Sequence, residues 1–267
     1  MTIRIGADPG TNPRAVLARA NPVAKLAVAG CVSVALVLTV DVVTAAAALL
    51  LELLALPWSG LPARSLLRRG WLLPAVALPS GLVTVLIGKD SGPVLLAAGP
   101  LSVTEGSLLI GSAIALRIVA IALPGVVLLA TTDPTDLAGA LAQVLRLPHR
   151  YVLSALAATR LAGVLSEEWR TLSLARRARG LGGDGPVGAV RGAAGQLFAL
   201  LVLAIRRATV LATAMEARGF GVQAERTWAR PSRFAGRDWL VVLGGILLAG
   251  AATAAGVLAG TWNLLLT

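Results

Sequence analysis

The sequence has few charged residues, few aromatic residues and one cysteine, and each shortage excludes a class of protein. Only 14% of its 267 residues are charged, whereas an ordinary soluble domain has about 25%. Cys31 is the only cysteine, so the chain can form neither an intramolecular disulfide nor a zinc site built from thiolates. The formal net charge is +11, but one tyrosine and three phenylalanines offer little for stacking on nucleotide bases. These shortages argue against a soluble domain, a disulfide-stabilised fold and a nucleic-acid-binding protein.

Motifs for catalysis and cofactor binding are also missing. The sequence has no G-x-x-x-x-G-K-[ST] phosphate-binding loop, so any ATP chemistry would belong to another chain. A literal G-x-G-x-x-G occurs at Gly180, Gly182 and Gly185, but it follows a predicted helix, whereas a dinucleotide site needs a preceding strand. His149 is the only histidine and has no neighbouring cluster of metal-ligating residues. We therefore predict no catalytic residue, no metal site and no cofactor.

What the sequence does have is long apolar runs, since 57% of its residues are hydrophobic. Several runs approach the roughly 20 residues that a helix needs to cross a hydrocarbon layer. They are continuous and rich in Leu and Ala, without the alternation of barrel strands, which predicts an all-α integral membrane protein. Prolines within two of the runs predict kinks. The five predicted spans are residues 23–40, 42–56, 71–88, 107–130 and 239–258.

The distribution of basic residues predicts the orientation of these spans. Residues 131–237, between the fourth and fifth spans, hold 15 of the 24 Lys and Arg residues, and positive charge marks the cytoplasmic side. Alternation then places Arg64, Arg68 and Arg69 inside, and only Lys89 in an external loop. We predict a cell-membrane protein with a cytoplasmic N-terminus and an external C-terminus. The expected divisions are a tail at 1–22, which lacks the apolar core of a signal peptide, spans at 23–130, a cytoplasmic domain at 131–237, and a last span with its tail at 238–267.

The cytoplasmic domain is predicted to contain three helices. Asp133 and Pro134 suit the start of the first, which is expected to reach about Arg146. The second is expected to run from about Arg150 to Gly180, and the third to end at Gly219. Within the third, residues 197–205 are almost entirely apolar. This stretch is too short to span a bilayer, so we expect a helix lying beneath or partly inside the membrane bundle.

A repeated pattern, A-x-x-A-R-G-hydrophobic-G, occurs at residues 175–182 and 214–221, at the predicted ends of the second and third cytoplasmic helices. Helix capping explains part of it, because glycine closes a helix in the left-handed conformation and arginine suits the negative end of the dipole. Two extended copies exceed what capping requires. Guanidinium groups bind carboxylates in planar, bidentate geometry, so we predict a docking surface for another protein. The predicted docking residues are Ala178, Arg179, Gly180, Ala217, Arg218 and Gly219.

Two charged residues, Glu52 and Arg117, fall inside the predicted spans at similar depths. Charges in lipid are costly and are usually paired or functional. We expect an ion pair between the second and fourth spans. A proton or substrate pathway is the alternative interpretation.

These motifs resemble the T component of energy-coupling factor transporters, the transmembrane coupling family that includes CbiQ. The resemblance extends over nearly the whole chain. It rests on N-P-x-x-K-L at residues 21–26, T-T-D-P at 131–134, L-P at 147–148, A-R-R-A-R-G-L at 175–181 and A-M-E-A-R-G-F at 214–220. The last two motifs are the most specific.

The resemblance implies that the three cytoplasmic helices are coupling helices. Their two arginine-containing ends would dock in grooves on a pair of cytoplasmic ABC-type ATPases, with Arg179 and Arg218 as anchors. The membrane helices would hold a small membrane-embedded S component that captures a vitamin or a transition-metal ion. ATP binding and hydrolysis on the partners would move the coupling helices and tilt that subunit.

Two other interpretations remain open on the residues alone. One is a self-contained secondary transporter or channel, in which Glu52 and Arg117 line a path and the basic domain is regulatory. The other is a receptor-like membrane scaffold that docks a partner without coupling to ATP. The repeated arginine motif favours the coupling protein, because a secondary carrier has no reason to end two cytoplasmic helices alike. The sequence does not indicate the substrate, or whether S components are dedicated or shared.

Overall fold

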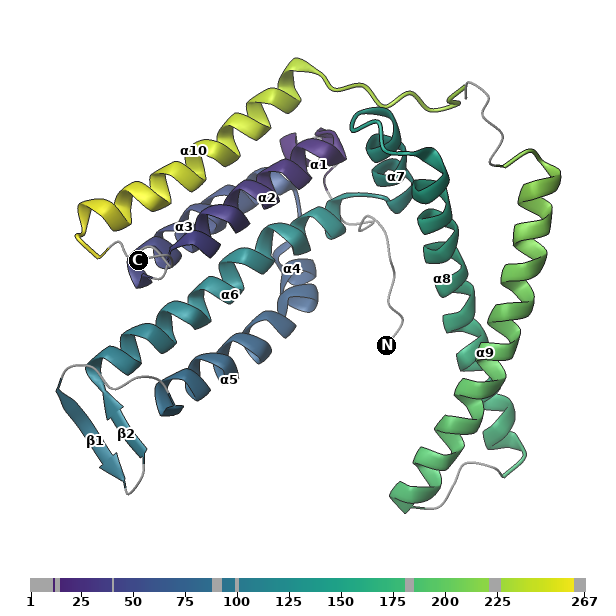
Figure 1. Ribbon diagram of the computed structural model, residues 1–267, viewed down its shortest axis with the longest axis horizontal. Helices are drawn as coiled ribbons and strands as arrows, with labels where there is room; N and C mark the ends of the chain where they lie inside the picture. The colour runs from purple at the N-terminus through teal and green to yellow at the C-terminus, as the bar shows by residue number, and fades with distance from the viewer. Residues whose placement is uncertain are drawn as a thin grey trace. The chain divides into compact units, whose positions relative to one another are not determined.

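The computed structural model describes residues 12, 15–39, 41–87, 93–98, 101–180, 185–220 and 227–261. These residues form two compact units, divided near residues 140 and 231. We call the described parts of 12–140 and 232–261 the bundle, and those of 141–231 the hairpin unit (Figure 1). Predictions for Lys89, Gly182 and the expected tails at 1–11 and 262–267 lie outside the described residues.

The bundle is built from helices that correspond to the five predicted spans. The boundaries differ from the prediction by a few residues, and a short helix precedes the third predicted span. The elements are α1 (Val16–Arg19), α2 (Pro22–Leu38), α3 (Val42–Ala55), the 3-10 turn η1 (Leu56–Ser59), α4 (Ala63–Gly70), α5 (Leu72–Ile87), α6 (Glu105–Thr131) and α10 (Gly236–Leu258).

The length and composition of the helices agree with a multi-pass membrane protein. Among the described residues, long apolar helical segments occupy 42–59, 105–131, 190–217 and 236–258. The pair α4 and α5 meets the same criterion together, with a bend of 46° between them, while α2 is apolar but shorter. The segment 190–217 lies in the predicted cytoplasmic domain. The expectation that its apolar stretch is too short to span therefore fails on length, because the helix extends well beyond 197–205.

Side-chain caps explain where several bundle helices begin. Asn21 precedes Pro22 and its Oδ1 accepts from the Val23 amide at 3.0 Å, satisfying one of the free amides of the first turn. Asp41 caps α3 through the Thr44 amide at 2.8 Å. Thr104 and Ser107 form a reciprocal capping box at the start of α6.

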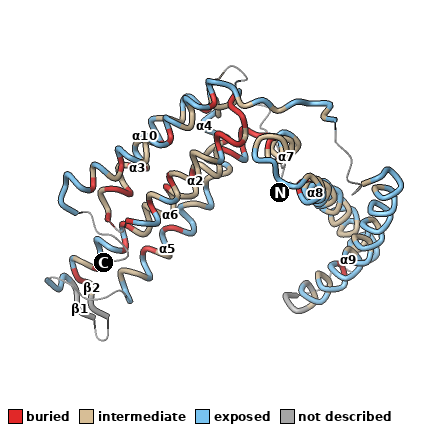
Figure 2. Tube along the Cα trace, turned by 45° about the horizontal axis from the view of Figure 1, so that its top comes forward, coloured by how far each residue is buried: buried red, intermediate tan, exposed pale blue. Residues whose placement is uncertain are grey.

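Small residues let the bundle helices approach one another closely. The core contains Val32 and Leu36 of α2, Ala48 of α3, Ala120 of α6 and Ala252 of α10, and buried residues gather along these helices in Figure 2. A Cβ added at Gly81 of α5 would lie 2.8 Å from the backbone oxygen of Gly111 in α6. Such contacts are typical of membrane helices, which associate by close packing rather than by excluding water.

A two-stranded antiparallel hairpin, β1 (Val94–Ala98) and β2 (Leu101–Thr104), connects α5 to α6. From the distribution of basic residues, we predicted an external loop containing Lys89 between the third and fourth spans. The β1–β2 hairpin is a small addition to a fold that is otherwise helical.

The hairpin unit consists of two long helices, and α7 (Pro134–Gln143) leads into it from the bundle. The two are α8 (His149–Ala178) and α9 (Gly185–Ala217), which start and end close to the predicted positions. Gln196 of α9 donates to the Trp169 carbonyl at 2.7 Å and to Ser173 Oγ at 2.6 Å, both on α8. Arg207 of α9 pairs with Glu168 of α8. These contacts fix where the two helices cross in Figure 1.

Candidate functional site

The two predicted arginine motifs form the same backbone structure at the ends of α8 and α9. Gly180 and Gly219 have φ values of 71° and 75°, the left-handed conformation that favours glycine. The Gly180 amide donates to the Arg177 carbonyl at 3.0 Å, and the Gly219 amide donates to the Glu216 carbonyl at 2.9 Å. At α9 the Phe220 amide also reaches the Met215 carbonyl at 2.9 Å, which completes a Schellman motif. The glycines are thus explained by helix termination.

Helix termination does not explain the arginines. Arg179 and Arg218 are both exposed, and within the described residues neither guanidinium has a hydrogen-bond or ion-pair partner. Each lies at the negative end of a helix dipole, where a cation is favoured. Their five N–H donors are therefore available to a partner that supplies carboxylates or carbonyl groups.

The two arginines lie far apart, because α8 and α9 run in opposite directions. The 33 residues of α9 extend about 50 Å along its axis. Arg179 is six residues before the start of α9, a separation of at most about 20 Å. Arg218 follows the other end of α9, so at least about 30 Å separates the two motifs. They therefore cannot enter one pocket together.

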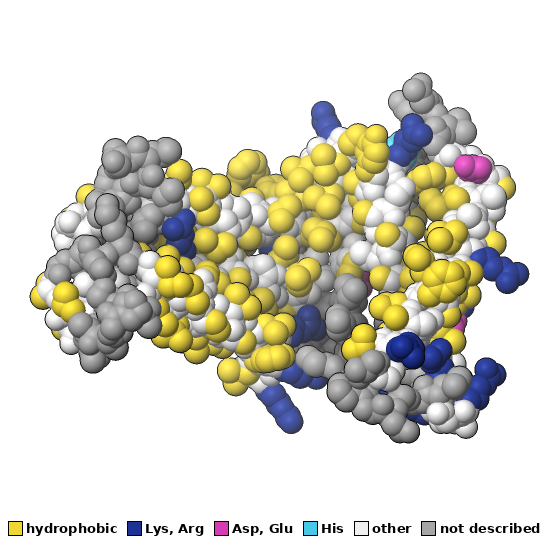
Figure 3. Space-filling view, turned by 60° about the horizontal axis from the view of Figure 1, so that its bottom comes forward, with side chains coloured by type: hydrophobic (Ala, Val, Ile, Leu, Met, Phe, Trp, Pro, Cys, Tyr) yellow, Lys and Arg dark blue, Asp and Glu magenta, His cyan; other side chains and the backbone are white. Residues whose placement is uncertain are grey.

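Between these ends, α9 presents an apolar surface. Leu197, Phe198, Leu201, Val202 and Ile205 are each more than half exposed, and most of α9 is exposed in Figure 2. Figure 3 shows apolar side chains over much of the displayed surface. A monomeric soluble protein rarely exposes such a continuous apolar stripe, so lipid or another protein must cover it.

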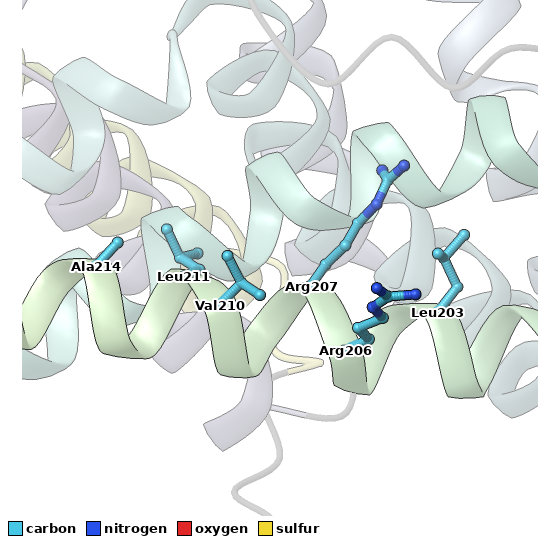
Figure 4. Close-up of a pocket in the computed structure, with 6 residues that line it drawn as sticks. All are labelled: Leu203, Arg206, Arg207, Val210, Leu211 and Ala214. Atoms are coloured by element: carbon cyan, nitrogen blue, oxygen red, sulfur yellow. The ribbon is translucent and has the colours of Figure 1, made fainter.

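A shallow groove of about 430 Å³ continues along α9 toward Arg218. Figure 4 shows that all of its lining side chains project from this one helix, with Arg206 and Arg207 beside apolar neighbours. The lining residues are Leu203, Arg206, Arg207, Val210, Leu211 and Ala214. The groove is mainly apolar. The guanidinium of Arg207 pairs with Glu168, and Arg206 also lines the groove.

The bundle contains a second polar cluster, which sequence reasoning did not assign as a site. Lys25 of α2 is only 5% exposed, and its Nζ donates to the Thr131 carbonyl at 3.2 Å, to Thr131 Oγ1 at 3.0 Å and to Thr132 Oγ1 at 3.1 Å. These three acceptors use all three protons of the ammonium group. Thr131 is the last residue of α6, so the cation also sits at the negative end of that helix.

A buried carboxylate joins the same end of α2 to α10. Asp238 is 1% exposed; its Oδ1 accepts from the Asn21 amide at 2.7 Å and its Oδ2 from the Ala235 amide at 2.7 Å. The Asn21 side chain donates to Ser232 Oγ at 3.1 Å and to the Arg233 carbonyl at 3.2 Å. We name Asn21, Lys25, Thr131, Thr132 and Asp238 the polar junction.

The expected ion pair between Glu52 and Arg117 is not formed. Glu52 is 7% exposed, and among the described residues neither carboxyl oxygen has a hydrogen-bond partner; it lines a cavity of about 100 Å³ with Lys25 and Ser59. Arg117 instead donates to the Val37 carbonyl at 2.7 Å. Val37 belongs to the last turn of α2, whose carbonyls lack partners within the helix. Similar depth along two helices was not enough to predict pairing, because it ignores which faces meet.

The polar junction could have been found from one signal in the sequence. Lys25 lies inside an apolar run and Asp238 immediately precedes another, and isolated charges at such places need partners. The contact between Asn21 and Asp238 could not be predicted from the sequence, because more than 200 residues separate them along the chain.

Comparison with known proteins places the chain in a family. The sequence profile described as cobalt transport protein, CbiQ, matches residues 13–228. The energy-coupling factor transporter transmembrane protein EcfT of Bacillus subtilis (strain 168) is 33% identical over 183 residues, 65% of this chain and 69% of that protein. A protein of the same name from Exiguobacterium sibiricum is 30% identical over 244 residues, 88% of this chain and 91% of that protein. With apolar helices suited to crossing a membrane and a profile match over most of its length, the chain belongs to the CbiQ family of cobalt transport proteins.

Proposed function

We propose that the chain is the transmembrane coupling subunit of an energy-coupling factor importer. In this proposal two cytoplasmic ABC-type ATPases bind the ends of α8 and α9, with Arg179 and Arg218 as anchors. The observation that carries the proposal is the pair of exposed arginine motifs, each followed by a glycine in the left-handed conformation, at least about 30 Å apart. Two equivalent anchors at this separation suit two copies of one kind of partner.

The apolar stripe of α9 supports the second half of the proposal. Leu197, Phe198 and Leu201 lie on a helix whose described residues are mostly exposed, and apolar surface of this kind needs lipid or protein cover. We assign it to contact with a membrane-embedded S component that captures a vitamin or a transition-metal ion. The substrate chemistry would then lie on the S component, and this chain would transmit motion without catalysis.

The docking proposal is tested by replacing Arg179 and Arg218 with alanine, singly and together. We expect each single variant to weaken co-purification of the ATPases, and the double variant to abolish it. Removing one charge-assisted contact at a buried interface costs about 2 to 5 kcal/mol. Arg→Lys variants should restore little, because an ammonium group cannot form the bidentate contact.

The matched control replaces Arg170 and Arg191, which are also exposed and lie on the same two helices, with alanine. This control removes the same charge and should leave the complex intact. Full retention of the ATPases by the Arg179→Ala/Arg218→Ala variant would refute docking through these ends. Substrate uptake by the chain without any ATPase would instead favour a secondary transporter.

A further inference from the structure

Within the described residues, the polar junction lies near the two places where the chain passes between the bundle and the hairpin unit. The first place lies within α7, which follows Thr131 and Thr132; the second lies near residue 231 and is followed by Ser232 and Arg233 before α10. Both places are flanked by residues bonded to the first turn of α2, the first through Lys25 and the second through Asn21. Two connections about 100 residues apart in sequence therefore share one anchor.

The bonds in this anchor are buried and mutually dependent. Lys25, Asn21 and Asp238 are each at least nine-tenths buried, and the Asp238 carboxylate uses both oxygens, one for the Asn21 amide and one for the Ala235 amide. Removing one partner would leave a buried charged or polar group without a hydrogen-bond partner, and this is costly in free energy. The start of α2 therefore holds both connections through buried hydrogen bonds that are costly to break.

The anchor has a mechanical consequence. Within the described part of the chain, motion of the hairpin unit reaches the bundle along the backbone through these two connections. A loose connection would absorb such motion by rotating its own backbone, as hinge segments do. A connection fixed to α2 transmits displacement to the helix that it is bonded to.

We propose that Asn21, Lys25, Thr132 and Asp238 are positioning residues that transmit nucleotide-driven motion of the hairpin unit to the first turn of α2. This inference rests on the proposed function, because it assumes ATPases that move α8 and α9. It adds to that function a defined route into the bundle. The route ends at α2, which contributes Val32 and Leu36 to the core.

The test compares hydrogen–deuterium exchange of the complex with and without a non-hydrolysable ATP analogue. In the unaltered complex we expect the analogue to change exchange in the hairpin unit and also at the start of α2, the end of α6 and the start of α10. Thr132→Val removes one hydroxyl at nearly constant volume. In this variant the change should persist in the hairpin unit and fall about five-fold or more in the bundle, the loss that a modest coupling free energy produces.

Two further variants separate transmission from folding. Thr132→Ser keeps the hydroxyl and should restore the bundle response. Thr253→Val removes a hydroxyl that bonds only within α10, and it should leave the response unchanged. A purely structural role would raise exchange equally with and without the analogue, and would not reduce the difference between the two states.

Each outcome bears on one proposal. A bundle response in Thr132→Val and Asp238→Asn equal to that of the unaltered complex would overturn the inference while leaving the proposed function intact. Raised exchange that does not depend on the analogue would also overturn it, in favour of a structural role. Failure of the unaltered chain to retain any ATPase would overturn the proposed function itself.

Discussion

At the scale of single residues, two basic side chains inside the bundle donate hydrogen bonds to carbonyl groups at helix ends. Lys25 donates to the last residue of α6, and Arg117 donates to a carbonyl in the last turn of α2. Both cations satisfy carbonyls that have no partner within their own helix, at the end where the dipole favours positive charge. Glu52 differs, because no described group satisfies its carboxyl oxygens.

Because Glu52 and Arg117 bind different groups or none, reversing both charges should not restore stability. We expect Glu52→Arg/Arg117→Glu to be no more stable than the worse of the single reversals, because the two side chains do not pair. Thermal unfolding of the detergent-purified protein would measure this. Recovery of stability in the double reversal would restore the ion-pair interpretation.

Removal of each charge should have opposite effects. Glu52→Leu replaces an unsatisfied buried carboxyl by an apolar group and should raise the free energy of unfolding by about 1 to 3 kcal/mol. Arg117→Met should lower it by about 1 kcal/mol, the usual range for a polar contact between membrane helices. Glu52→Leu that unfolds at a lower temperature would show that the carboxyl has a partner, such as water in its cavity.

At the scale of elements, the helix ends separate a backbone requirement from the proposed docking role. Gly180 and Gly219 are needed for the left-handed cap, whereas nothing described within the chain needs the guanidinium groups of Arg179 and Arg218. The glycine and the arginine are adjacent in sequence, but the first would contribute to folding stability and the second mainly to partner binding.

Glycine and arginine substitutions should therefore give different signatures. Gly180→Ala should destabilise the chain by about 1 kcal/mol, because an L side chain is strained at positive φ, although open space surrounds this Cβ position. Arg179→Ala should lower the free energy of unfolding by less than Gly180→Ala, because it removes only an exposed cation from the helix end, and should act mainly on partner binding. Circular dichroism melts of the two variants would compare them, and an equal loss of stability in both would contradict the separation.

The elements show how far sequence reasoning reaches. Apolar runs and caps predicted the helices closely, because length and periodicity are local properties, and Asp133 caps α7 as expected through the Thr135 amide. The arginine motifs were found because they repeat. The polar junction and the contact of Arg117 with the Val37 carbonyl depend on which distant faces meet, and this is not a local property of the sequence.

At the scale of the whole molecule, the main question is whether α9 crosses the membrane or lies on its cytoplasmic side. Its segment 190–217 is long and apolar enough to span a membrane, which would put Arg179 and Arg218 on opposite sides. Arg206 and Arg207 lie near the middle of that segment, where charges are costly in lipid. The distribution of basic residues also favours a cytoplasmic α9.

Labelling from one side of the membrane tests this orientation. In a Cys31→Ala background, cysteines introduced at Ala178, Trp228 and Gly260 would be probed with an impermeant maleimide in intact cells and in inverted vesicles. We expect labelling at the first two positions only in inverted vesicles, and at the third only in intact cells. Labelling at Ala178 and Trp228 from opposite sides would instead show that α9 crosses the bilayer.

The most direct measurement of the central claim is site-specific cross-linking at the two helix ends. Ala178 and Ala217 are exposed and adjacent to Arg179 and Arg218, so cysteines at these positions, in the Cys31→Ala background, would carry a short photoreactive group. The account predicts that each position cross-links to an ATPase subunit, and that the doubly labelled chain captures two. Cross-linking at neither position, with the ATPases still bound to the chain, would contradict it.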